Sequence, residues 1–314
     1  MKIGHPRVSI CLPVYNGEEY IREAIRSVLD QTFEDFELII SDNASEDRTA
    51  EICNEFSTKD PRVFYSRSDI NRGLAWNHNR TFAQAKGQFL MWIGHDDLLG
   101  RAYISRCIEA MDEDPGVVLS YSNANHIDDN GNSISQVDMN TPATSNKPSQ
   151  RFQSILYTYI DVMIYGLMKR EILSQTALHG GFAESDRVLL AEMGLRGRFH
   201  LVPEYLYSRR FHHMKTSLTD SRERTLVFDP SRAGKVFFPE LDKSVALFSA
   251  VNRAELPLSE RLSCYKHLLG WFQLRRNTFW KDLQIGLKIK ATELENQHRK
   301  VTSIAKRFQK NSGA

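Results

Sequence analysis

The stretch QFLMWIGHDD, residues 88–97, decides how the rest of the chain is interpreted. Its apolar run is typical of a strand buried on both faces, and that run ends at two adjacent carboxylates, Asp96 and Asp97. Neighbouring carboxylates repel each other, so stability alone does not explain such a pair at the end of a core strand. A divalent cation held by oxygen ligands beside a phosphate would explain it. The alternative is that Asp97 caps a following helix, and this stretch alone leaves both interpretations open.

The composition is that of a globular protein with a full-sized core. The chain has 314 residues and 41% hydrophobic content, enough for one large domain or for one domain with an appendage. Its 41 Lys and Arg nearly balance its 39 Asp and Glu, which argues against nucleic acid as a partner. The four cysteines are scattered without a C-x-x-C pair, so we expect free thiols in a reducing compartment and no zinc ribbon.

Two kinds of membrane or export signal are missing from the sequence. No apolar run approaches the ~20 residues of a transmembrane helix, and residues 1–7 lack the apolar centre of a secretory signal. We therefore expect a cytoplasmic protein. Peripheral attachment to the inner face of a membrane stays open.

Short apolar runs alternate with helical spacing through the first 121 residues. The predicted strands cover residues 8–14, 36–40, 63–65, 89–93 and 117–121, and the helices between them cover 18–31, 47–56, 74–85 and 103–111. Such alternation predicts a mostly parallel α/β sheet, in which ligands bind at the carboxyl ends of the strands. Pro13 should lie at the end of its strand, because proline has no N–H to donate to a neighbouring strand.

The carboxyl ends of three predicted strands carry polar or unusual residues. Pro13 and Tyr15 follow the first strand, Asp42 and Asn43 the second, and residues 95–97 the opening stretch. In a parallel sheet these ends lie along one edge. This placement favours the metal interpretation of the carboxylate pair over the helix cap.

The second half of the chain is less regular. A hairpin turn is predicted at 128–132 inside a long loop, 123–150, which we expect to be functional or mobile. Beyond it we predict a strand at 162–168, a short helix at 169–176, and two strands at 199–202 and 205–211.

From residue 239 the sequence becomes helical and finally basic. Amphipathic stretches at 241–251 and 258–274 lead into a charged segment, 288–310, with apolar residues at helical spacing. A solvated helix end is the plain interpretation. Contact with an anionic membrane surface and a homodimer contact are the alternatives.

Four short motifs in this order resemble the family 2 glycosyltransferases of GT-A fold. They are Val-x-Ile-x-Leu-Pro-Val-Tyr-Asn-Gly from residue 8, Ser-Asp-Asn-Ala-Ser-x-Asp from 41, Asn-Arg-Gly from 71, and Trp-x-x-x-Asp-Asp from 92. The resemblance covers about residues 8–217. It implies an α/β, Rossmann-like mixed sheet in a GT-A domain, 1–238, with a nucleotide-binding half, 1–122, an acceptor half, 123–238, and a C-terminal helical appendage, 239–314.

The resemblance also implies an activity and a donor site. Members of the family transfer a sugar from a nucleotide-diphosphate sugar, here with a UDP-sugar favoured, usually with Mg²⁺ or Mn²⁺. Its residues carry over as follows: Pro13, Tyr15 and Glu18 or Glu19 border the nucleotide, Asp42 beside Asn43 bonds the base, and Arg72 approaches the nucleotide or diphosphate. As a structural alternative, Asp42 would cap a helix and Arg72 would be a solvated turn residue.

The metal motif departs from the family pattern Asp-x-Asp-Asp at its first position, which is Gly94 here. The carboxylate commonly used near the ribose is therefore missing, and His95 or a water would substitute for it. By resemblance, Asp96 coordinates the metal and Asp97 is the second choice. His212 or the neighbouring His213 would reach the metal or the diphosphate.

The catalytic base implied by the resemblance is Asp186, at the start of a predicted buried helix. Inversion at the anomeric carbon requires a group that deprotonates the acceptor hydroxyl opposite the leaving nucleotide. Glu184 is the second candidate, and a helix cap is the structural alternative for Asp186.

The resemblance implies an inverting glycosyltransferase that builds bacterial surface polysaccharide on a saccharide or lipid-linked saccharide acceptor. A nucleotidyltransferase also uses paired aspartates on an α/β sheet, but the first loop, 13–17, lacks the glycines and basic residues that it usually needs. A nucleotide-sugar-binding module without catalysis is suggested only by Gly94. The donor sugar, acceptor and linkage cannot be read from the sequence.

Overall fold

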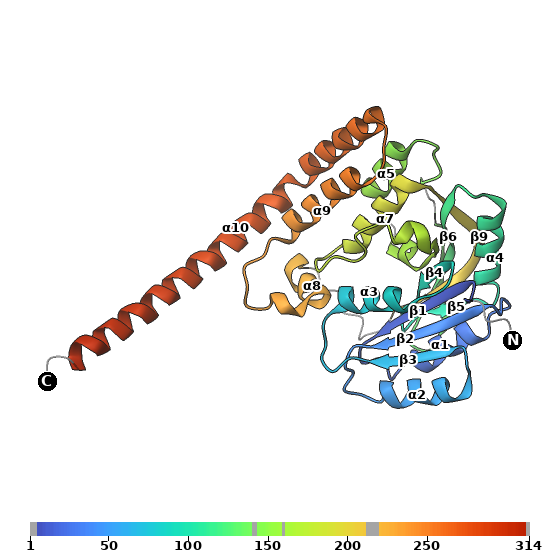
Figure 1. Cartoon of the computed structure of the whole chain (residues 1–314), viewed down its shortest axis with the longest axis horizontal. Coiled ribbons are helices and arrows are strands. Elements are labelled where there is room, and N and C mark those ends of the chain that lie inside the picture. The colour runs from blue at the N-terminus through green and yellow to red at the C-terminus, as the bar shows by residue number, and fades with distance from the viewer. Residues whose placement is uncertain (1–4, 140–142, 159–160, 212–219, 312–314) are drawn as a thin grey trace.

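The computed structural model describes residues 5–139, 143–158, 161–211 and 220–311, with the backbone alone at 161 and 291–311. A nine-stranded sheet with helices on both faces forms the body, from which a long C-terminal helix projects (Figure 1). The strands are β1 Val8–Val14, β2 Phe36–Asp42, β3 Val63–Arg67, β4 Phe89–Trp92, β5 Leu98–Leu99, β6 Val117–Ile127, β7 Ser133–Val137, β8 Leu167–Lys169 and β9 Arg198–Arg210. The helices of the body are α1 Ile21–Leu29, α2 Thr49–Lys59, α3 Leu74–Gln84, α4 Tyr103–Glu113, α5 Pro148–Tyr157, the 3₁₀ helix η1 Asp161–Tyr165, α6 Arg170–Leu173 and α7 Ser185–Arg196. The helices after β9 are α8 Ser221–Phe228, the 3₁₀ helix η2 Pro230–Arg232, α9 Pro239–Arg253 and α10 Leu258–Asn311.

The first four long strands form the predicted parallel sheet. Their order is β3-β2-β1-β4, and β1 pairs in parallel with β2 and β4. Every residue of β1, β2 and β4 is buried, as their continuous apolar runs predict. Helices α2 and α3 lie on opposite sides of this half of the sheet (Figure 1). The buried side of α1 repeats every three or four residues, the spacing of one helix face.

The second half of the chain continues the same sheet with mixed strand directions. β8 lies antiparallel between β4 and β6, and β6 pairs in parallel with β9. β9 then pairs antiparallel with the two-residue β5. The mixed sheet of the GT-A type is thereby confirmed, and residues from both predicted halves, 1–122 and 123–238, contribute strands to the same sheet.

The strand predicted at 162–168 is wrong for most of its length. Residues 161–165 form η1, and only β8 extends along the sheet. Gly166 separates the two where the chain passes close to β6: a Cβ there would lie 2.9 Å from the carbonyl oxygen of Ser120. The helix predicted at 169–176 is shorter, since α6 ends at Leu173.

The two strands predicted at 199–202 and 205–211 are one strand, β9, of 13 residues. Pro203 and Glu204 lie within it, where the register with β6 shifts between Val202 and Tyr205. A bulge of this kind accommodates a proline without ending the strand. β6 is also longer than predicted and forms the expected hairpin with β7, whose turn contains Gly131 at φ 83°.

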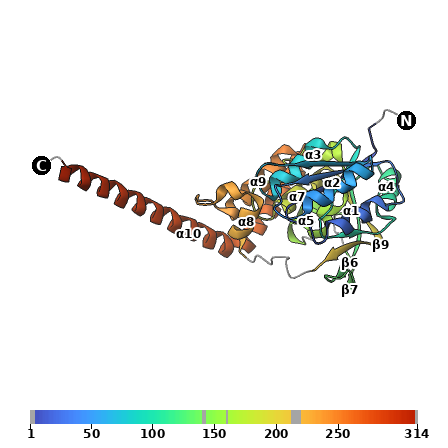
Figure 2. The ribbon, with the colours of Figure 1, turned by 90° about the horizontal axis from the view of Figure 1, so that it is seen from below.

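The C-terminal region is helical, as predicted, but its last two predicted segments form one helix. α10 has 54 residues, packs against α5 and α9 along its first part, and then leaves the body (Figures 1 and 2). Across the part of the chain that the structure describes, we find no helix with the length and apolarity needed to cross a bilayer.

Candidate active site

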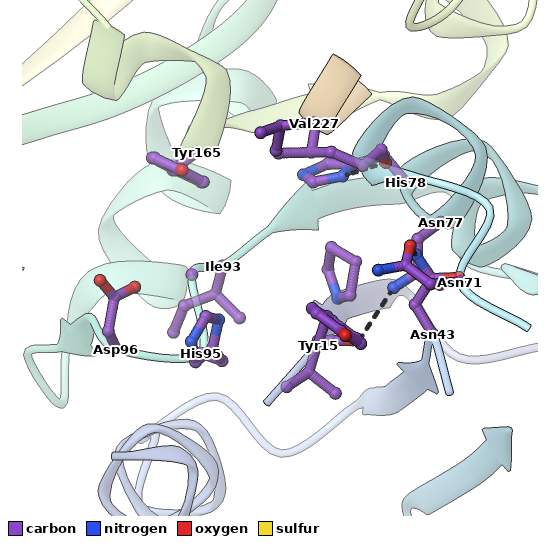
Figure 3. Close-up of a pocket in the computed structure, with 14 residues that line it drawn as sticks. Tyr15, Asn43, Asn71, Asn77, His78, Ile93, His95, Asp96, Tyr165 and Val227 are labelled. Carbon is purple, nitrogen blue, oxygen red and sulfur yellow. Dashed lines mark hydrogen bonds between the residues drawn. The ribbon is translucent and has the colours of Figure 1, made fainter. Parts of the chain in front are cut away.

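A pocket of about 380 Å³ opens at the carboxyl ends of β1, β2 and β4, at the edge predicted from the sequence. The end of β1 contributes Pro13 to its lining, the loop that follows contributes Tyr15, and the segment after β4 contributes His95 and Asp96. Figure 3 shows Asp96 and His95 on one side of the pocket and a group of asparagines on the other. The pocket therefore has an acidic end and an amide-rich end.

Pro13 fits the wall of the pocket because of where β4 ends. β1 pairs with β4 from Val8 to Cys11 only, whereas its pairing with β2 continues past Pro13. At Pro13 no β4 residue faces β1, so the missing N–H costs no ladder hydrogen bond on that side. The predicted position of this proline at the strand end is confirmed.

Asn43 organises the amide-rich end. Its side chain donates to Oδ1 of Asn71 at 2.8 Å and accepts from the backbone N–H of Arg72 at 3.0 Å. Asn77, from α3, donates to the carbonyl of Ser41 at 2.8 Å. These bonds fix amide groups in the wall, where a ligand with donors and acceptors, such as a nucleobase, could be matched. Sequence reasoning missed Asn77; its only signal was a polar residue on a helix expected to pack inward.

Asp42 lies in β2, fully buried, and is not among the residues that line the pocket. Its carboxylate accepts from the backbone N–H of Ser45 at 2.8 Å and from the hydroxyl of Tyr65 at 2.8 Å, and pairs with Arg67 at 3.2 Å. Burial and the bond to Asp42 raise the pKa of Tyr65, which stays a donor. In this structure Asp42 shapes the turn that carries Asn43.

Two further predicted residues, Glu18 and Arg72, lie outside the pocket lining. Glu18 accepts from the backbone N–H of Arg48 at 2.9 Å and so holds the loop after β1 to the start of α2. The guanidinium of Arg72 is exposed and lies 5.2 Å from the ring centre of Trp76.

The two neighbouring aspartates of the opening stretch have different surroundings. Both are buried, but Asp96 lines the pocket whereas Asp97 is held by β9. The hydroxyl of Tyr207 donates to Asp97 at 2.6 Å, and the backbone N–H of Arg210 donates to its other oxygen at 2.9 Å. Burial and the charge of Asp97 raise the pKa of Tyr207 well above its ordinary value. Arg210 also donates from Nε to the carbonyl oxygen of Asp96 at 2.9 Å, which fixes the backbone of the pair.

Gly94 is matched to this arrangement of carboxylates. A Cβ at this position would lie 2.8 Å from Oδ2 of Asp97 and 2.9 Å from Oδ1 of Asp96. Because Asp97 is fixed by two donors, a larger residue would require the pair to move. Packing against the carboxylate pair therefore explains why glycine, and not the aspartate of the family pattern, occupies position 94.

The acidic end suits a divalent cation that is shared with a ligand. Among the residues that the structure describes, no three His, Cys, Asp or Glu side chains form a ready-made metal site. His212, the predicted third ligand, and its neighbour His213 lie outside the described residues. Mg²⁺ is commonly held by one or two carboxylates together with substrate phosphates and water. Asp96, with its carboxylate in the pocket, fits that kind of ligand.

A histidine pair that was not predicted flanks the pocket. His78 lines it, and its ring centre lies 4.8 Å from that of His179 and 5.7 Å from that of Trp92. Burial lowers the pKa of His78 to about 4, so its ring is neutral near pH 7. Nδ1 lies 2.9 Å from the carbonyl of Leu74 and must be the donor there, which leaves Nε2 as an acceptor.

Asp186 is in the first turn of α7 and half-buried, and it is not part of the pocket lining. One of its oxygens accepts from the backbone N–H of Arg187 at 2.9 Å. The preceding residue, Ser185, has its hydroxyl 3.3 Å from Nδ1 of His179. The start of α7 is thus connected to the pocket wall through the histidine pair. Tyr165 from η1 and Val227 from α8 complete the lining, and nothing in their local sequence indicated this.

Glu184, the alternative base, is held in a cluster of cations. Its carboxylate lies 3.1 Å from Arg187, 3.2 Å from Arg224, 3.3 Å from Lys243 and 3.6 Å from Arg275. Burial alone would raise the pKa of Glu184, but these cations outweigh burial and lower the pKa to about 2. A carboxylate held so firmly in its charged form is a weak base.

The sheet, its order and the following helices define the fold of GT-A glycosyltransferases. TarS of S. aureus, residues 1–349, has this fold with a TM-score of 0.64 and 16% identity, over 87% of this chain and 74% of that chain. The mannosyltransferase PcManGT of Pyrobaculum calidifontis, solved with GDP-Man and Mn²⁺, gives a TM-score of 0.52 and 19% identity, over 92% and 87% of the two chains.

Residues 9–176 match glycosyl transferase family 2, and the chain belongs to this family. The glycosyltransferase GlyG of Streptococcus pneumoniae serotype 4 is 24% identical over 300 residues, which span 90% of this chain and 95% of GlyG. Chondroitin synthase of Escherichia coli is 32% identical over 130 residues, 41% of this chain and 19% of that protein. The protein is a glycosyltransferase.

Proposed function

We propose that the protein transfers a sugar from a UDP-sugar to an acceptor hydroxyl with inversion at the anomeric carbon. The observation that carries this proposal is the two-ended pocket, with fixed amides at one end and Asp96 at the other. A nucleoside diphosphate has the same polarity, with a hydrogen-bonding base at one end and anionic phosphates at the other. TarS has been solved with UDP and with UDP-GlcNAc, which supports the choice of nucleotide.

In this proposal Asn43 and Asn77 are at the base end and Tyr15 lies between the two ends. His95 is near the ribose, where Gly94 supplies no carboxylate. A Mg²⁺ or Mn²⁺ ion, as in the PcManGT complex, would neutralise charge on the leaving diphosphate, and Asp96 is the residue that would hold it.

We assign to Asp186 the removal of the proton from the acceptor hydroxyl. Its carboxylate is half-exposed at the start of α7, whereas the charge of Glu184 is fixed by four cations. Loss of this proton lets the acceptor oxygen attack the anomeric carbon opposite the departing nucleotide. The acceptor class that we propose is a saccharide, free or lipid-linked, of a bacterial surface polysaccharide.

The test is a turnover assay over a panel of UDP-, GDP- and ADP-sugars with and without Mn²⁺, with saccharide acceptors. Asp186→Asn should keep UDP binding, measured by thermal shift, but lose acceptor-dependent transfer by 100-fold or more, on the order expected for a general base. Asp35→Asn, an exposed aspartate just before β2, is the matched control and should turn over normally. Transfer that survives Asp186→Asn would overturn the base assignment, and pyrophosphate in place of free UDP would indicate nucleotidyl transfer.

A further inference from the structure

The C-terminal helices present an apolar face to solvent. On α9 the exposed apolar residues recur at positions i, i+4 and i+7. On α10 the exposed apolar residues of this face follow one side of the helix from its first turn. We call these residues the outer face, and each of them is between 41% and 70% exposed: Leu241, Val245, Phe248, Leu258, Leu262, Leu269, Trp280 and Leu287. Single exposed apolar residues are ordinary, but several aligned along one side of two adjacent helices are typical of a binding surface.

The two helices form one surface and not two separate stripes. A largely apolar groove of about 380 Å³ runs between them, lined by Leu241 of α9 and by Phe272, Phe279 and Trp280 of α10. Near the other end of α9, Phe248 stacks on Tyr265 with ring centres 5.1 Å apart. The outer face therefore extends across both helices.

The apolar spacing continues through the rest of α10. The backbone is helical to Asn311. From Trp280 onward the sequence has an apolar residue at every seventh position, namely Leu287, Leu294, Val301 and Phe308. A spacing of seven residues corresponds to nearly two turns of a helix, so the sequence itself has the period of an amphipathic helix.

The charge of the chain is concentrated on this helix. α10 contains 12 of the 41 Lys and Arg but only 4 of the 39 Asp and Glu, a formal charge of +8. The remaining residues, with 29 basic and 35 acidic side chains, carry −6. A second copy bound along the outer face would place one strongly basic helix beside another. An anionic surface would be attracted by the same charge.

We propose that the outer face of α9 and α10 binds the surface of a bilayer that contains anionic lipid. A basic helix with one apolar stripe lies in the plane of the interface, its apolar side chains among the lipid headgroups and upper acyl chains. Trp280 is of the residue type that favours this depth, and Arg276 in the groove can extend its charge toward phosphate along an apolar stem. The inference does not depend on the identity of the donor sugar.

The test is co-sedimentation of the full chain with two kinds of vesicle, phosphatidylcholine alone and phosphatidylcholine with 30% phosphatidylglycerol. We expect at least tenfold tighter binding to the anionic vesicles and loss of most of that binding in 0.5 M NaCl. The variant Leu262→Gln/Leu269→Gln/Trp280→Gln should weaken binding to them at least tenfold, because it removes the apolar contact.

Two controls make the result decisive. Ile134→Gln/Phe64→Gln changes exposed apolar residues of β7 and β3 and should bind as the parent does. Circular dichroism establishes that each variant is folded. Equal binding to both vesicles, or triple-variant binding equal to that of the parent, overturns the proposal. So does light scattering that shows a parent dimer and a triple-variant monomer, since the outer face would then be a contact between copies.

Discussion

Replacement of Glu184 by glutamine should destabilise the protein strongly, because this carboxylate joins α7 to the helices that follow. Its partners come from α7, α8, α9 and α10 (Arg187, Arg224, Lys243 and Arg275). The pKa of Glu184 falls from 4.5 to about 2 in the folded protein. At 1.36 kcal/mol per pKa unit, this corresponds to about 3 kcal/mol of stabilisation.

The pH dependence follows from the direction of the pKa change. Because the folded-state pKa lies below the unfolded-state value of 4.5, the stabilisation is complete above about pH 4.5 and is lost as the pH falls toward 2. Glu184→Gln keeps the shape of the side chain but removes its charge. We therefore expect the variant to lose about 3 kcal/mol of unfolding free energy at pH 7 and to approach the parent as the pH falls from 4.5 toward 2.

Urea unfolding followed by far-UV circular dichroism at pH 7 and pH 3 measures both quantities. Glu113→Gln, an exposed glutamate at the end of α4, is the matched control and should change the unfolding free energy by less than about 0.5 kcal/mol. A loss at pH 7 no larger than that of the control would refute the reasoning. So would a difference between parent and Glu184→Gln that is the same at both pH values, because it would show that charge is not the cause.

Three further predictions concern the pocket. Gly94→Ala should lower the unfolding free energy by about 1–3 kcal/mol through overpacking against the carboxylate pair, and Gly94→Asp should lower it more by adding a third carboxylate. Thermal unfolding compares the two variants with the parent. An Asp variant as stable as the parent would contradict the packing reason. Tyr207→Phe leaves an oxygen of Asp97 without its donor and should cost about 1–3 kcal/mol in urea unfolding, whereas no loss would mean that the bond is dispensable. Since burial lowers the pKa of His78 to about 4, its protonation favours the unfolded chain, and stability should fall as the pH drops from 6.5 to 4. In His78→Phe the melting temperature should depend less on pH over that range. A melting temperature that varies with pH as steeply as in the parent would contradict the lowered pKa.

The edge of the pocket could be predicted from the sequence because its residues lie at or just past the ends of three neighbouring parallel strands, β1, β2 and β4. Pro13, Tyr15, Asn43, His95 and Asp96 all line it. In a parallel sheet, a residue just past one strand lies near the residue just past the next, so order along the chain indicates proximity in space. Motifs at those positions carry most of the information about this edge of the pocket.

The far wall could not be predicted in this way. Tyr165 and Val227 come from a 3₁₀ turn and from a short helix, whose positions depend on packing with α7 and α3. β8 has only three residues, too few to show a strand period. Local sequence thus indicated little about this wall of the pocket.

Side-chain direction was also hidden from the sequence. Asp42 and Asp97 both belong to the family motifs, yet both are buried and bonded to residues far along the chain, Tyr65 for the first and Tyr207 for the second. The bonds that β9 makes to Asp97 decide which of the two adjacent aspartates faces the pocket. A motif gives the residue types of a site, and the tertiary partners decide which of them face the ligand.

The pairing of β5 with β9 affects the order in which the site can form. Leu98 and Leu99, directly after the two aspartates, pair with Ser208 and Tyr207, more than 100 residues later. Closing so long a loop is slow, and during synthesis β9 follows all the earlier strands of the sheet. The edge formed by the ends of β1, β2 and β4 can assemble first, but the two aspartates acquire fixed positions only when β9 docks. A nascent chain or fragment that ends before β9 should therefore contain both aspartates without the contacts from Tyr207 and Arg210 that fix Asp97.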